Sequence, residues 1–449
     1  MTGNNTIVAP ATARGQGAIA IVRLSGPDAL RWALRITKRE TLTPRCAHLS
    51  TLYNGSNEPI DQAIVIYFAA PKSYTGEALV EFQTHGGDAA SSVLIDVLVA
   101  LGARLAEPGE FSRRAILNGK MDAAQAEAAA ALIAAKSTRA ATLLARQLTG
   151  GLGDFVSSVR DRLIRLRAHA EVSIDYAEED LPEDLKSQML EQLTMLKLEL
   201  ENTLQSSRRR QGMLCGFRAA IIGKPNAGKS SLLNALLNYD RAIVSDQAGT
   251  TRDTIEEEVR IGEHLIRLID TAGLRHSEDA IEQIGIAYSR RAASGADLVI
   301  ALFDASQPMS SEDRAVLALL EELRADQSVL IALNKCDLPM RIESEAFRAF
   351  ERVEISAKQD VSALIAKLQS LLQAQCAGEE TLLVSMRQIQ IVEACQAQIA
   401  QAQTHLLTGD LELFGYHCAE SIGLIGTLTR PFEYGELLDV MFGEFCLGK

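Results

Sequence analysis

GKPNAGKSS, residues 223–231, lies between the apolar run Phe217-Arg-Ala-Ala-Ile-Ile222 and the segment Leu232-Leu-Asn-Ala-Leu-Leu237. This order predicts a strand, a glycine-rich turn and a helix. A turn of the form G-x-x-x-x-G-K-S brings successive backbone N–H groups together on an anion at the helix N-terminus. The anion that such a turn holds is the phosphate chain of a nucleotide, so this stretch predicts a nucleotide-binding α/β block.

Individual positions of this loop have separate roles in holding the nucleotide. Gly223 and Gly228 permit the tight turn, and Lys229 is placed to reach the outer phosphates. The hydroxyl of Ser230 is placed to ligate Mg²⁺. A chance glycine-rich turn is the alternative, and the flanking strand and helix argue against it.

The composition is that of an ordinary globular protein. The chain has 449 residues, of which 47% are hydrophobic and 23% charged, and this length suggests about three domains. No apolar run approaches the roughly twenty residues needed to span a bilayer, and the N-terminus lacks a secretory signal pattern. We therefore expect no membrane partner. The seven cysteines are scattered and never spaced as C-x-x-C, which predicts reduced, cytoplasmic thiols with no zinc site and no disulfide framework.

The charge distribution limits how the protein contacts nucleic acid. The formal charge is −13, whereas residues 1–120 carry twelve Lys/Arg against ten Asp/Glu. The negative total argues against a protein whose whole surface binds nucleic acid through counterion release, so any RNA contact must be local or supplied by a partner. The run Arg208-Arg209-Arg210 is the most basic spot, and we interpret it as a solvated linker.

Residues 1–118 are expected to form an α+β domain, because short β-like runs alternate there with helical patterns. The expected strands are 18–24, 63–68 and 79–83, and the expected helices are 27–36 and 90–101. Polar clusters at 73–77 and 84–87 follow strand ends, where ligand-binding loops usually lie. His85 in the second cluster is interpreted as a loop or core histidine.

The rest of the chain is expected to be a helical domain interrupted by the nucleotide-binding block. Residues 119–215 are rich in Ala and Leu, with breaks at Gly150-Gly151 and Leu181-Pro182, and residues 376–449 are again mostly helical. Between them lies the α/β block of residues 216–375.

Two further motifs in this block suit the outer phosphates. The polar segment Ala248-Gly-Thr-Thr-Arg-Asp253 precedes a predicted strand, 265–269, that ends in Asp270-Thr-Ala-Gly273. Asp270 is placed to hold Mg²⁺ through a water, and Thr251 is the natural second hydroxyl ligand. The N–H of Gly273 is placed to meet the γ-phosphate.

The remaining motifs select the base. Asn334-Lys-Cys-Asp337 follows the predicted strand 329–333, and Ser356-Ala-Lys358 follows 353–355. A carboxylate at Asp337 accepts hydrogen bonds from the ring N–H and the exocyclic amine of guanine, a donor pair that adenine lacks. Cys336 is interpreted as a small packing residue. Four motifs in this order predict a Ras-like P-loop GTPase domain that uses GTP and Mg²⁺.

The predicted GTP site takes in the motif residues together with their neighbours. It comprises Asn226, Ala227, Gly228, Lys229, Ser230, Ser231, Ser245, Asp246, Gln247, Ala248, Gly249, Thr250, Thr251, Asp270, Thr271, Ala272, Gly273, Asn334, Lys335, Asp337, Ser356, Ala357 and Lys358.

Leu274 excludes one way of orienting the water that attacks GTP. In Ras-like proteins a glutamine after the D-x-x-G motif orients the attacking water, and leucine cannot hydrogen-bond to it. Asn226 in the phosphate loop could instead bind a monovalent cation where an arginine finger would otherwise act. For the water, Glu282 is the nearest acidic candidate, although a solvated helix residue is the more frequent role of such a glutamate.

Several stretches resemble one known family. GKPNAGKSSLLNALL, RAIVSDQAGTTRD, DTAGLR and the terminal Phe445-Cys-Leu-Gly-Lys449 are similar to the MnmE (TrmE) family of tRNA-modification GTPases, in the TrmE-Era-like class. SYTGEALVEFQTHGG and PGEFSRRAILNGKMDAAQAEA resemble the same family outside the GTPase block, so the resemblance covers essentially the whole chain.

The resemblance implies a potassium-dependent, homodimeric GTPase that works with a flavoprotein, MnmG (GidA), in a heterotetramer or larger complex. Together such proteins add an aminomethyl or carboxymethylaminomethyl group to carbon five of the wobble uridine of certain tRNAs. The one-carbon donor is a tetrahydrofolate derivative, 5,10-methylene- or 5-formyl-tetrahydrofolate, held by the N-terminal domain. FAD is bound only by the partner.

The resemblance also assigns roles to residues of this chain. It implies that Asn226, Ser245, Gln247 and Thr250 form the potassium site. Glu282 then orients the water, acting with Lys229 and Asn226 as the catalytic set, and Cys446 keeps an open role. The folate positions implied are Arg23, Glu81, Lys120 and Lys449.

A second function remains open from the residues alone. A GTP-switched ribosome-assembly or RNA-interaction module would share the phosphate loop and the missing glutamine. The folate-like N-terminal stretches and the CLGK tail favour the modification enzyme.

Overall fold

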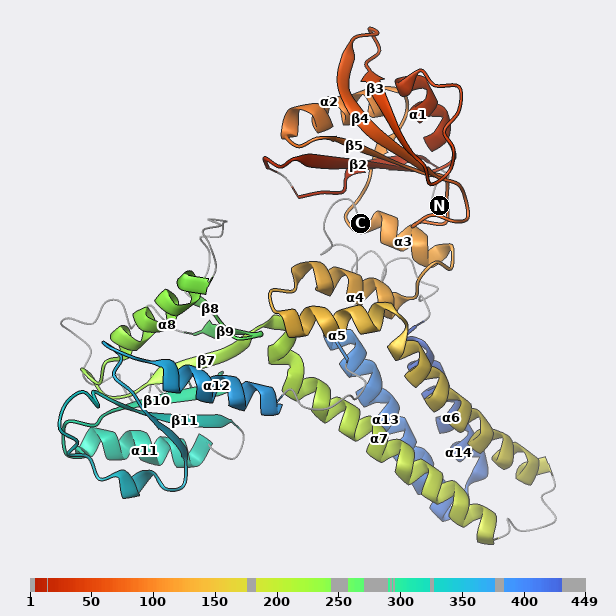
Figure 1. Cartoon of the computed structure of the whole chain (residues 1–449). Coiled ribbons are helices and arrows are strands. Elements are labelled where there is room, and N and C mark those ends of the chain that lie inside the picture. The colour runs from red at the N-terminus through yellow and green to blue at the C-terminus, as the bar shows by residue number, and fades with distance from the viewer. Residues whose placement is uncertain are drawn as a thin grey trace. The chain divides into compact units, whose positions relative to one another are not determined.

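The structure is a computed structural model, and it describes residues 5–13, 15–175, 183–243, 257–269, 290, 293, 295–323, 327–375 and 383–429. The chain divides into two compact units (Figure 1). One unit contains Met1–Ala130, Gln147–Lys197 and Gln390–Lys449, and the other contains Ala131–Arg146 and Leu198–Ile389. In the described part of the chain, no helix has the length and apolar character needed to cross a membrane.

The N-terminal part of the first unit is a six-stranded sheet with the order β3-β4-β5-β2-β1-β6. Its strands are β1 Ile7–Pro10, β2 Ile19–Ser25, β3 Ala47–Tyr53, β4 Pro59–Phe68, β5 Leu79–His85 and β6 Arg104–Leu105. The helices of this part are α1 Ala29–Thr37, α2 Asp88–Ala100 and α3 Glu110–Leu117. The predicted strands and helices of this α+β domain are confirmed, and β1, β3 and β6 are additional.

One face of this sheet is covered by α1 and α2. Trp32 and Ile36 of α1 pack with Leu94 of α2 against alternate strand residues such as Val65 and Phe82. In β4, Ala63 and Val65 are therefore buried whereas Gln62 and Ile64 are exposed, as the period of two requires. In β1 both Ile7 and Val8 are buried, because Ile7 packs with Phe111 of α3.

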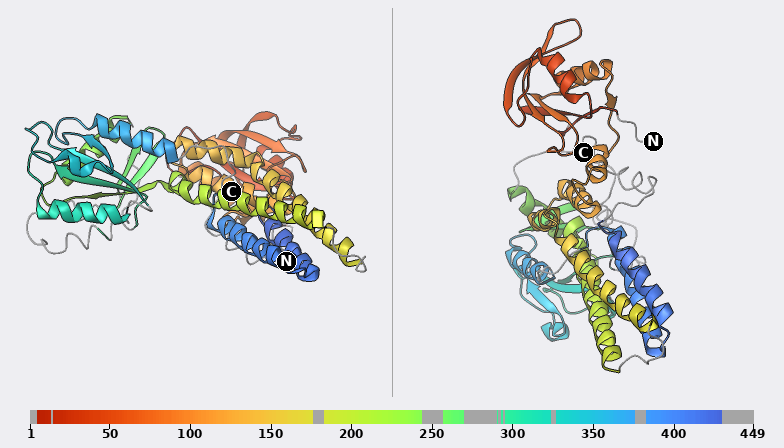
Figure 2. Two further views of the ribbon diagram at one scale, coloured as in Figure 1. Left: turned by 90° about the horizontal axis from the view of Figure 1, so that it is seen from below. Right: turned by 90° about the vertical axis from the view of Figure 1, so that its right-hand side faces the viewer.

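The described helical segments are long. They are α4 Ala123–Ala134, α5 Thr138–Leu148, α6 Gly151–Asp175, α7 Glu183–Cys215, α13 Met386–Thr408 and α14 Leu411–Gly426. Within the first unit, α6 and α14 pack along each other and lie side by side in both views of Figure 2. The chain turns between α5 and α6 at Gly150, whose φ of 99° lies in the left-handed region that favours glycine.

The interpretation of Arg208-Arg209-Arg210 as a linker is wrong, because this run lies inside α7. Arginine has a high helix propensity, and the helix continues through the run to Cys215.

The second unit contains a six-stranded sheet with the order β12-β11-β10-β7-β9-β8. The strands are β7 Phe217–Ile222, β8 Glu257–Ile261, β9 His264–Leu268, β10 Leu298–Asp304, β11 Ser328–Asn334 and β12 Glu351–Glu354. All neighbouring pairs are parallel except the β8–β9 pair. The helical elements around it are α8 Lys229–Ile243, α11 Ser311–Leu323, α12 Ser362–Gln375 and the short 3₁₀ helix η1 Ser344–Phe347.

This sheet is the centre of three layers. Leu236 of α8 and Leu368 of α12 pack on one face with Ile221, whereas Leu320 of α11 packs on the other with Ile222 (Figure 1). Because both faces are covered, β10 is apolar from Leu298 to Phe303, and all seven of its residues are buried. The expected multidomain class is thus confirmed: an α+β domain, an all-α domain and an α/β P-loop domain.

Candidate nucleotide-binding site

The phosphate loop lies at the point where the strand order reverses. The chain runs from β7 to β8 and β9 on one side of β7, and then to β10 on its other side. In open α/β sheets, ligands bind beyond the carboxyl ends of the strands at this reversal. Gly223 directly follows β7, and α8 begins at Lys229, so the predicted strand, turn and helix are confirmed.

Two glycines of the loop are required by close backbone and side-chain contacts. Gly223 has a φ of 152°, and a Cβ atom added there would lie 2.4 Å from the Leu302 carbonyl oxygen. Gly228 has a φ of 103°, and its Cβ would lie 2.2 Å from Nδ2 of Asn334. Any larger residue at either position would push the loop away from the sheet.

Lys229 is folded back over its own loop. Its Nζ donates to the carbonyl oxygens of Gly223 and Lys224, both at 2.8 Å. Burial lowers the pKa of this ammonium, although Glu312 opposes the shift. The ammonium therefore lies at the loop beside the N-terminus of α8, where the helix dipole and the first backbone N–H groups also attract an anion.

Asn334 joins the phosphate loop to the loop that follows β12. Its Nδ2 donates to the Ala227 carbonyl at 2.8 Å, and its Oδ1 accepts from the Ala357 N–H at 2.9 Å. The side chain is buried, with 3% of its surface exposed. Asn334 is therefore a structural link between two loops, a role that the base-reading motif alone does not reveal.

The predicted base-reading residues come together at the ends of β11 and β12. Asp337 and Lys358 are exposed, whereas Ser356 is half-buried. The backbone N–H of Cys336 donates to the Ile355 carbonyl at 3.1 Å and so ties the two loops together. A carboxylate and backbone groups thus lie side by side at the same edge of the sheet.

Cys336 packs against the core between the sheet and α11, as expected. Burial raises the pKa of its thiol. This cysteine is therefore a neutral packing residue.

Sequence reasoning missed Asp304. It ends β10, and its carboxylate pairs with Nζ of Lys335 at 2.6 Å. Burial alone would raise the pKa of Asp304, but the hydrogen bonds from Lys335 and Ser306 outweigh it and lower that pKa. The position of an aspartate directly after the apolar run 298–303 was the available signal.

A second missed pair lies at the phosphate loop itself. Nζ of Lys224 lies 2.7 Å from Oδ2 of Asp313 in α11. No sequence signal joins these two residues, which are 89 positions apart.

The remaining predicted GTP, metal and catalytic residues lie outside the described residues. They are Ser245, Asp246, Gln247, Ala248, Gly249, Thr250, Thr251, Asp270, Thr271, Ala272, Gly273 and Glu282, and Leu274, Cys446 and Lys449 also fall there.

The N-terminal sheet brings Arg23 and Glu81 together. They face each other across β2 and β5, and the guanidinium donates to Oε1 of Glu81 at 2.8 and 3.1 Å. The guanidinium carbon lies 5.1 Å from the ring centre of Tyr74 and 5.7 Å from that of Phe111. The two charged side chains are only 16% and 17% exposed. We call the Arg23–Glu81 pair, together with the neighbouring rings of Tyr74 and Phe111, the polar spot.

Lys120 lies beside the loop 73–77, which also contains Tyr74. A Cβ atom added at Gly76 would be 3.3 Å from Cγ of Lys120, so the lysine stem passes close to that loop. Three of the four predicted folate residues, Arg23, Glu81 and Lys120, thus lie in the N-terminal part of the chain.

His85 of the second polar cluster is not in the core. Its ring is exposed, and Nδ1 lies 2.7 Å from Oδ1 of Asp61.

Two family models match the chain. One, described as the GTP-binding protein TrmE N-terminus, matches residues 6–120, and the other, described as the MnmE helical domain, matches residues 124–446.

Curated relatives match over the whole length. The tRNA modification GTPase MnmE of Sulfurovum sp. (strain NBC37-1) is 51% identical over 445 residues, 99% of each chain. The protein of the same name from Aliarcobacter butzleri (strain RM4018) is 51% identical over 449 residues, covering 100% of both.

Among solved structures, one of Era in complex with MgGDPNP and nucleotides 1506-1542 of 16S ribosomal RNA covers 40% of this chain and 66% of its own. Its sequence identity is 23% and its TM-score is 0.26.

Proposed function

Because the chain belongs to the MnmE family of tRNA modification GTPases, we propose that it acts on carbon five of the wobble uridine. With a flavoprotein of the MnmG (GidA) type, it installs the aminomethyl or carboxymethylaminomethyl group on certain tRNAs. The observation that carries this proposal is the family match outside the GTPase block, over residues 6–120. A ribosome-assembly GTPase would not need that N-terminal part.

The residues of the phosphate loop fit GTP. The two glycines let the loop pass close to Leu302 and Asn334, and the loop leads directly into the N-terminus of α8, where the helix dipole favours an anion. The ammonium of Lys229 has three N–H donors, of which two go to the Gly223 and Lys224 carbonyls, so the third can donate to a phosphate oxygen. Asp337 then reads the guanine edge, while Asn334 holds both loops in register.

Ser230 and Asn226 fit the two metal ions that we propose. Ser230 is the second residue of α8, so its hydroxyl lies at the end of the helix that follows the phosphate loop and would hold Mg²⁺ there. Asn226 has a left-handed φ of 62°, a conformation that asparagine adopts more readily than most residues. A potassium ion bound through its amide oxygen would supply positive charge to the transition state.

The polar spot on the N-terminal sheet fits a tetrahydrofolate. Arg23 suits the glutamate carboxylates of such a cofactor, and Glu81 can accept hydrogen bonds from an aminopterin ring. The rings of Tyr74 and Phe111, which already lie beside the guanidinium, add flat apolar surface for the pterin. The cofactor would supply the one-carbon unit, and the protein residues would bind and orient it.

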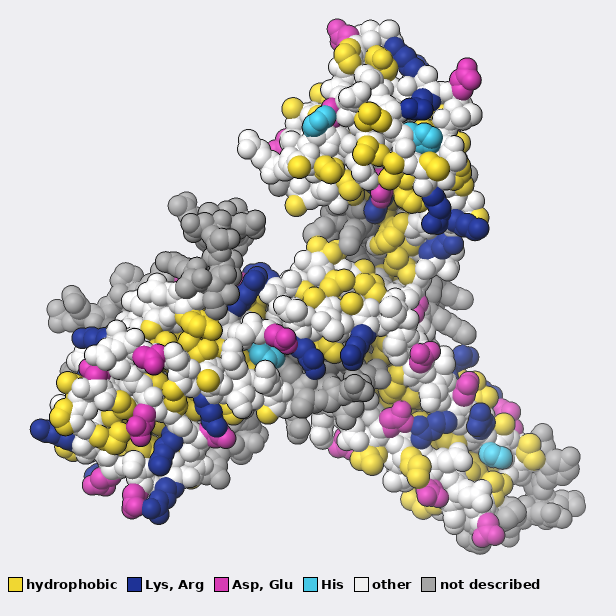
Figure 3. Space-filling model, viewed as in Figure 1, with side chains coloured by type: hydrophobic (Ala, Val, Ile, Leu, Met, Phe, Trp, Pro, Cys, Tyr) yellow, Lys and Arg dark blue, Asp and Glu magenta, His cyan; other side chains and the backbone are white. Residues whose placement is uncertain are grey.

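The outer face of the N-terminal sheet supports the proposed homodimer. Leu49, Ile64 and Ile19 are 60%, 37% and 57% exposed, and Leu49 pairs directly with Ile64 across β3 and β4. Figure 3 shows hydrophobic side chains on this part of the surface. Through Ile66, which pairs with Glu81, the same face continues to the Arg23–Glu81 pair, so a second copy docked there would border the folate spot.

We also propose a cytoplasmic location. Among the described residues, Cys46, Cys336, Cys395 and Cys418 are free thiols, which suits a reducing compartment.

The test is reconstitution with the flavoprotein, bulk tRNA, methylene-tetrahydrofolate and GTP. We expect modified wobble uridine only when both proteins and GTP are present, with more product in potassium than in sodium chloride. Wobble uridine that stays unmodified in the complete mixture, while GTP is hydrolysed, would argue for the GTP-switched alternative.

A further inference from the structure

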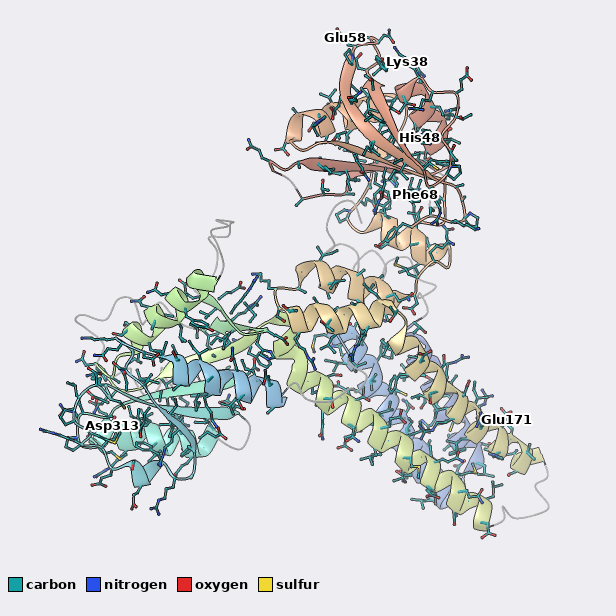
Figure 4. The ribbon with its side chains drawn as sticks, viewed as in Figure 1. Lys38, His48, Glu58, Phe68, Glu171 and Asp313 are labelled. Atoms are coloured by element: carbon teal, nitrogen blue, oxygen red, sulfur yellow. The ribbon has the colours of Figure 1, made fainter. Side chains whose placement is uncertain are left out.

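The ion pair between Lys224 and Asp313 connects the phosphate loop to the beginning of α11, where Figure 4 labels Asp313. The two side chains are 14% and 1% exposed. The pair is therefore largely removed from water. A buried ion pair fixes its two side chains more firmly than a pair at the surface does.

Asp313 is held by the start of its own helix. Its Oδ2 accepts from the backbone N–H of Ser310 at 2.9 Å and from the Ser310 hydroxyl at 2.7 Å. In return the N–H of Asp313 donates to Oγ of Ser310 at 3.2 Å. This reciprocal arrangement is a capping box. The carboxylate of Asp313 is therefore held by its own helix, independently of its contact with the phosphate loop.

The charge on Asp313 is balanced by Lys224 in this structure. The other carboxylate oxygen, Oδ1, is buried with no hydrogen-bond partner among the described residues. Removing the lysine would leave a buried carboxylate with only the two Ser310 donors, an arrangement that is costly in a low-dielectric interior.

Lys224 in turn supports the functional lysine. Its carbonyl oxygen accepts from Nζ of Lys229 at 2.8 Å and from the Ala227 N–H at 3.4 Å. The residue whose side chain is anchored on α11 is therefore the residue whose main chain carries the ammonium of Lys229. The ammonium of Lys224 itself is turned toward the carboxylate of Asp313.

We propose that Asp313 is a positioning residue for GTP binding, which acts through Lys224 to fix the first turn of the phosphate loop and the ammonium of Lys229. This inference rests on the proposed GTP site and adds to it a partner outside all four nucleotide motifs. Without the pair, the free loop samples more conformations. Ordering the loop on binding then costs more entropy, and the affinity for the phosphate chain falls.

The test is titration of a fluorescent GTP analogue into Lys224→Met, Asp313→Asn and the double variant. We expect each single variant to bind about tenfold more weakly and the double variant to be no weaker than the singles, because the pair acts as a unit. Lys224→Arg keeps the charge and should restore affinity. Lys367→Met is the matched control, because Lys367 pairs with Glu351 on the edge strand β12, three strands from β7.

Two results would overturn the proposal. Lys224→Met that binds within about twofold of the wild type would mean that the pair has only a structural role, even if the melting temperature falls. Asp313→Asn that binds as tightly as the wild type would mean that Lys224 does not need its partner. If Asp313→Asn does not fold, the loop variant Lys224→Met still decides the question. Failure of the wild type itself to bind the analogue would instead refute the proposed GTP site.

Discussion

Asn334→Ala tests whether the two nucleotide-binding loops are assembled by one side chain. Asn334 makes two hydrogen bonds, to the Ala227 carbonyl at 2.8 Å and from the Ala357 N–H at 2.9 Å. Alanine removes both at once. The two freed backbone groups belong to the phosphate loop and to the loop that follows β12, so both loops are affected.

The expected loss follows from these two bonds. Each contributes about 1 kcal/mol net, and a buried group left without a partner costs about 1–3 kcal/mol. The loops can relax toward water to satisfy the freed groups, but GTP must then reassemble them. A loss of about 2 kcal/mol in binding free energy corresponds to about thirtyfold weaker affinity.

The assay is equilibrium titration of a fluorescent GTP analogue, with thermal unfolding as a parallel measurement. Asn54→Ala is a suitable control, because Asn54 bonds Glu58 at an exposed turn of the N-terminal domain. An Asn334→Ala protein with the affinity of the wild type, whether or not it is less stable, would refute the reasoning that this side chain assembles the site.

Three other substitutions test separate parts of the site. Gly228→Ala places a Cβ 2.2 Å from Asn334 at a φ of 103°, so we expect GTP binding to be lost in the same titration; retained binding would contradict the close packing. Asp337→Asn should weaken GTP by about tenfold or more while inorganic pyrophosphate still competes as before, and unchanged GTP affinity would exclude the base-reading role. Asn226→Gly keeps the left-handed backbone but removes the amide, so phosphate-release kinetics should lose their preference for potassium over sodium; a variant that still prefers potassium would remove Asn226 from the cation site.

The sequence predicts best those features that are local. The apolar run and glycine turn around residue 223 define β7, the loop and α8 because strand, turn and helix signals follow one another directly. The short strands β1 and β6 are missed, because their pairing joins residues about a hundred positions apart and neither run is long enough to show a period.

The residues of the site also divide into those predicted from local sequence and those that depend on long-range packing. Motif residues such as Asn334 are recognised from spacing, but the link from Asn334 to Ala227 depends on how β11 and β7 are placed in the sheet. The Lys224–Asp313 pair has no local pattern at all and arises only when α11 packs beside the loop. At Arg208–Arg210, the local charge suggested a linker, but the helix that contains the run decides its structure.

The central claim is that this GTPase is required for modification of the wobble uridine. Mass spectrometry of tRNA nucleosides from a deletion strain tests it most directly, with the wild-type gene or a Gly228→Ala gene restored as comparison. We expect the modified wobble uridines to disappear in the deletion strain, to return with the wild-type gene and to stay absent with Gly228→Ala. A deletion strain with an unchanged level of modified wobble uridine would contradict the account.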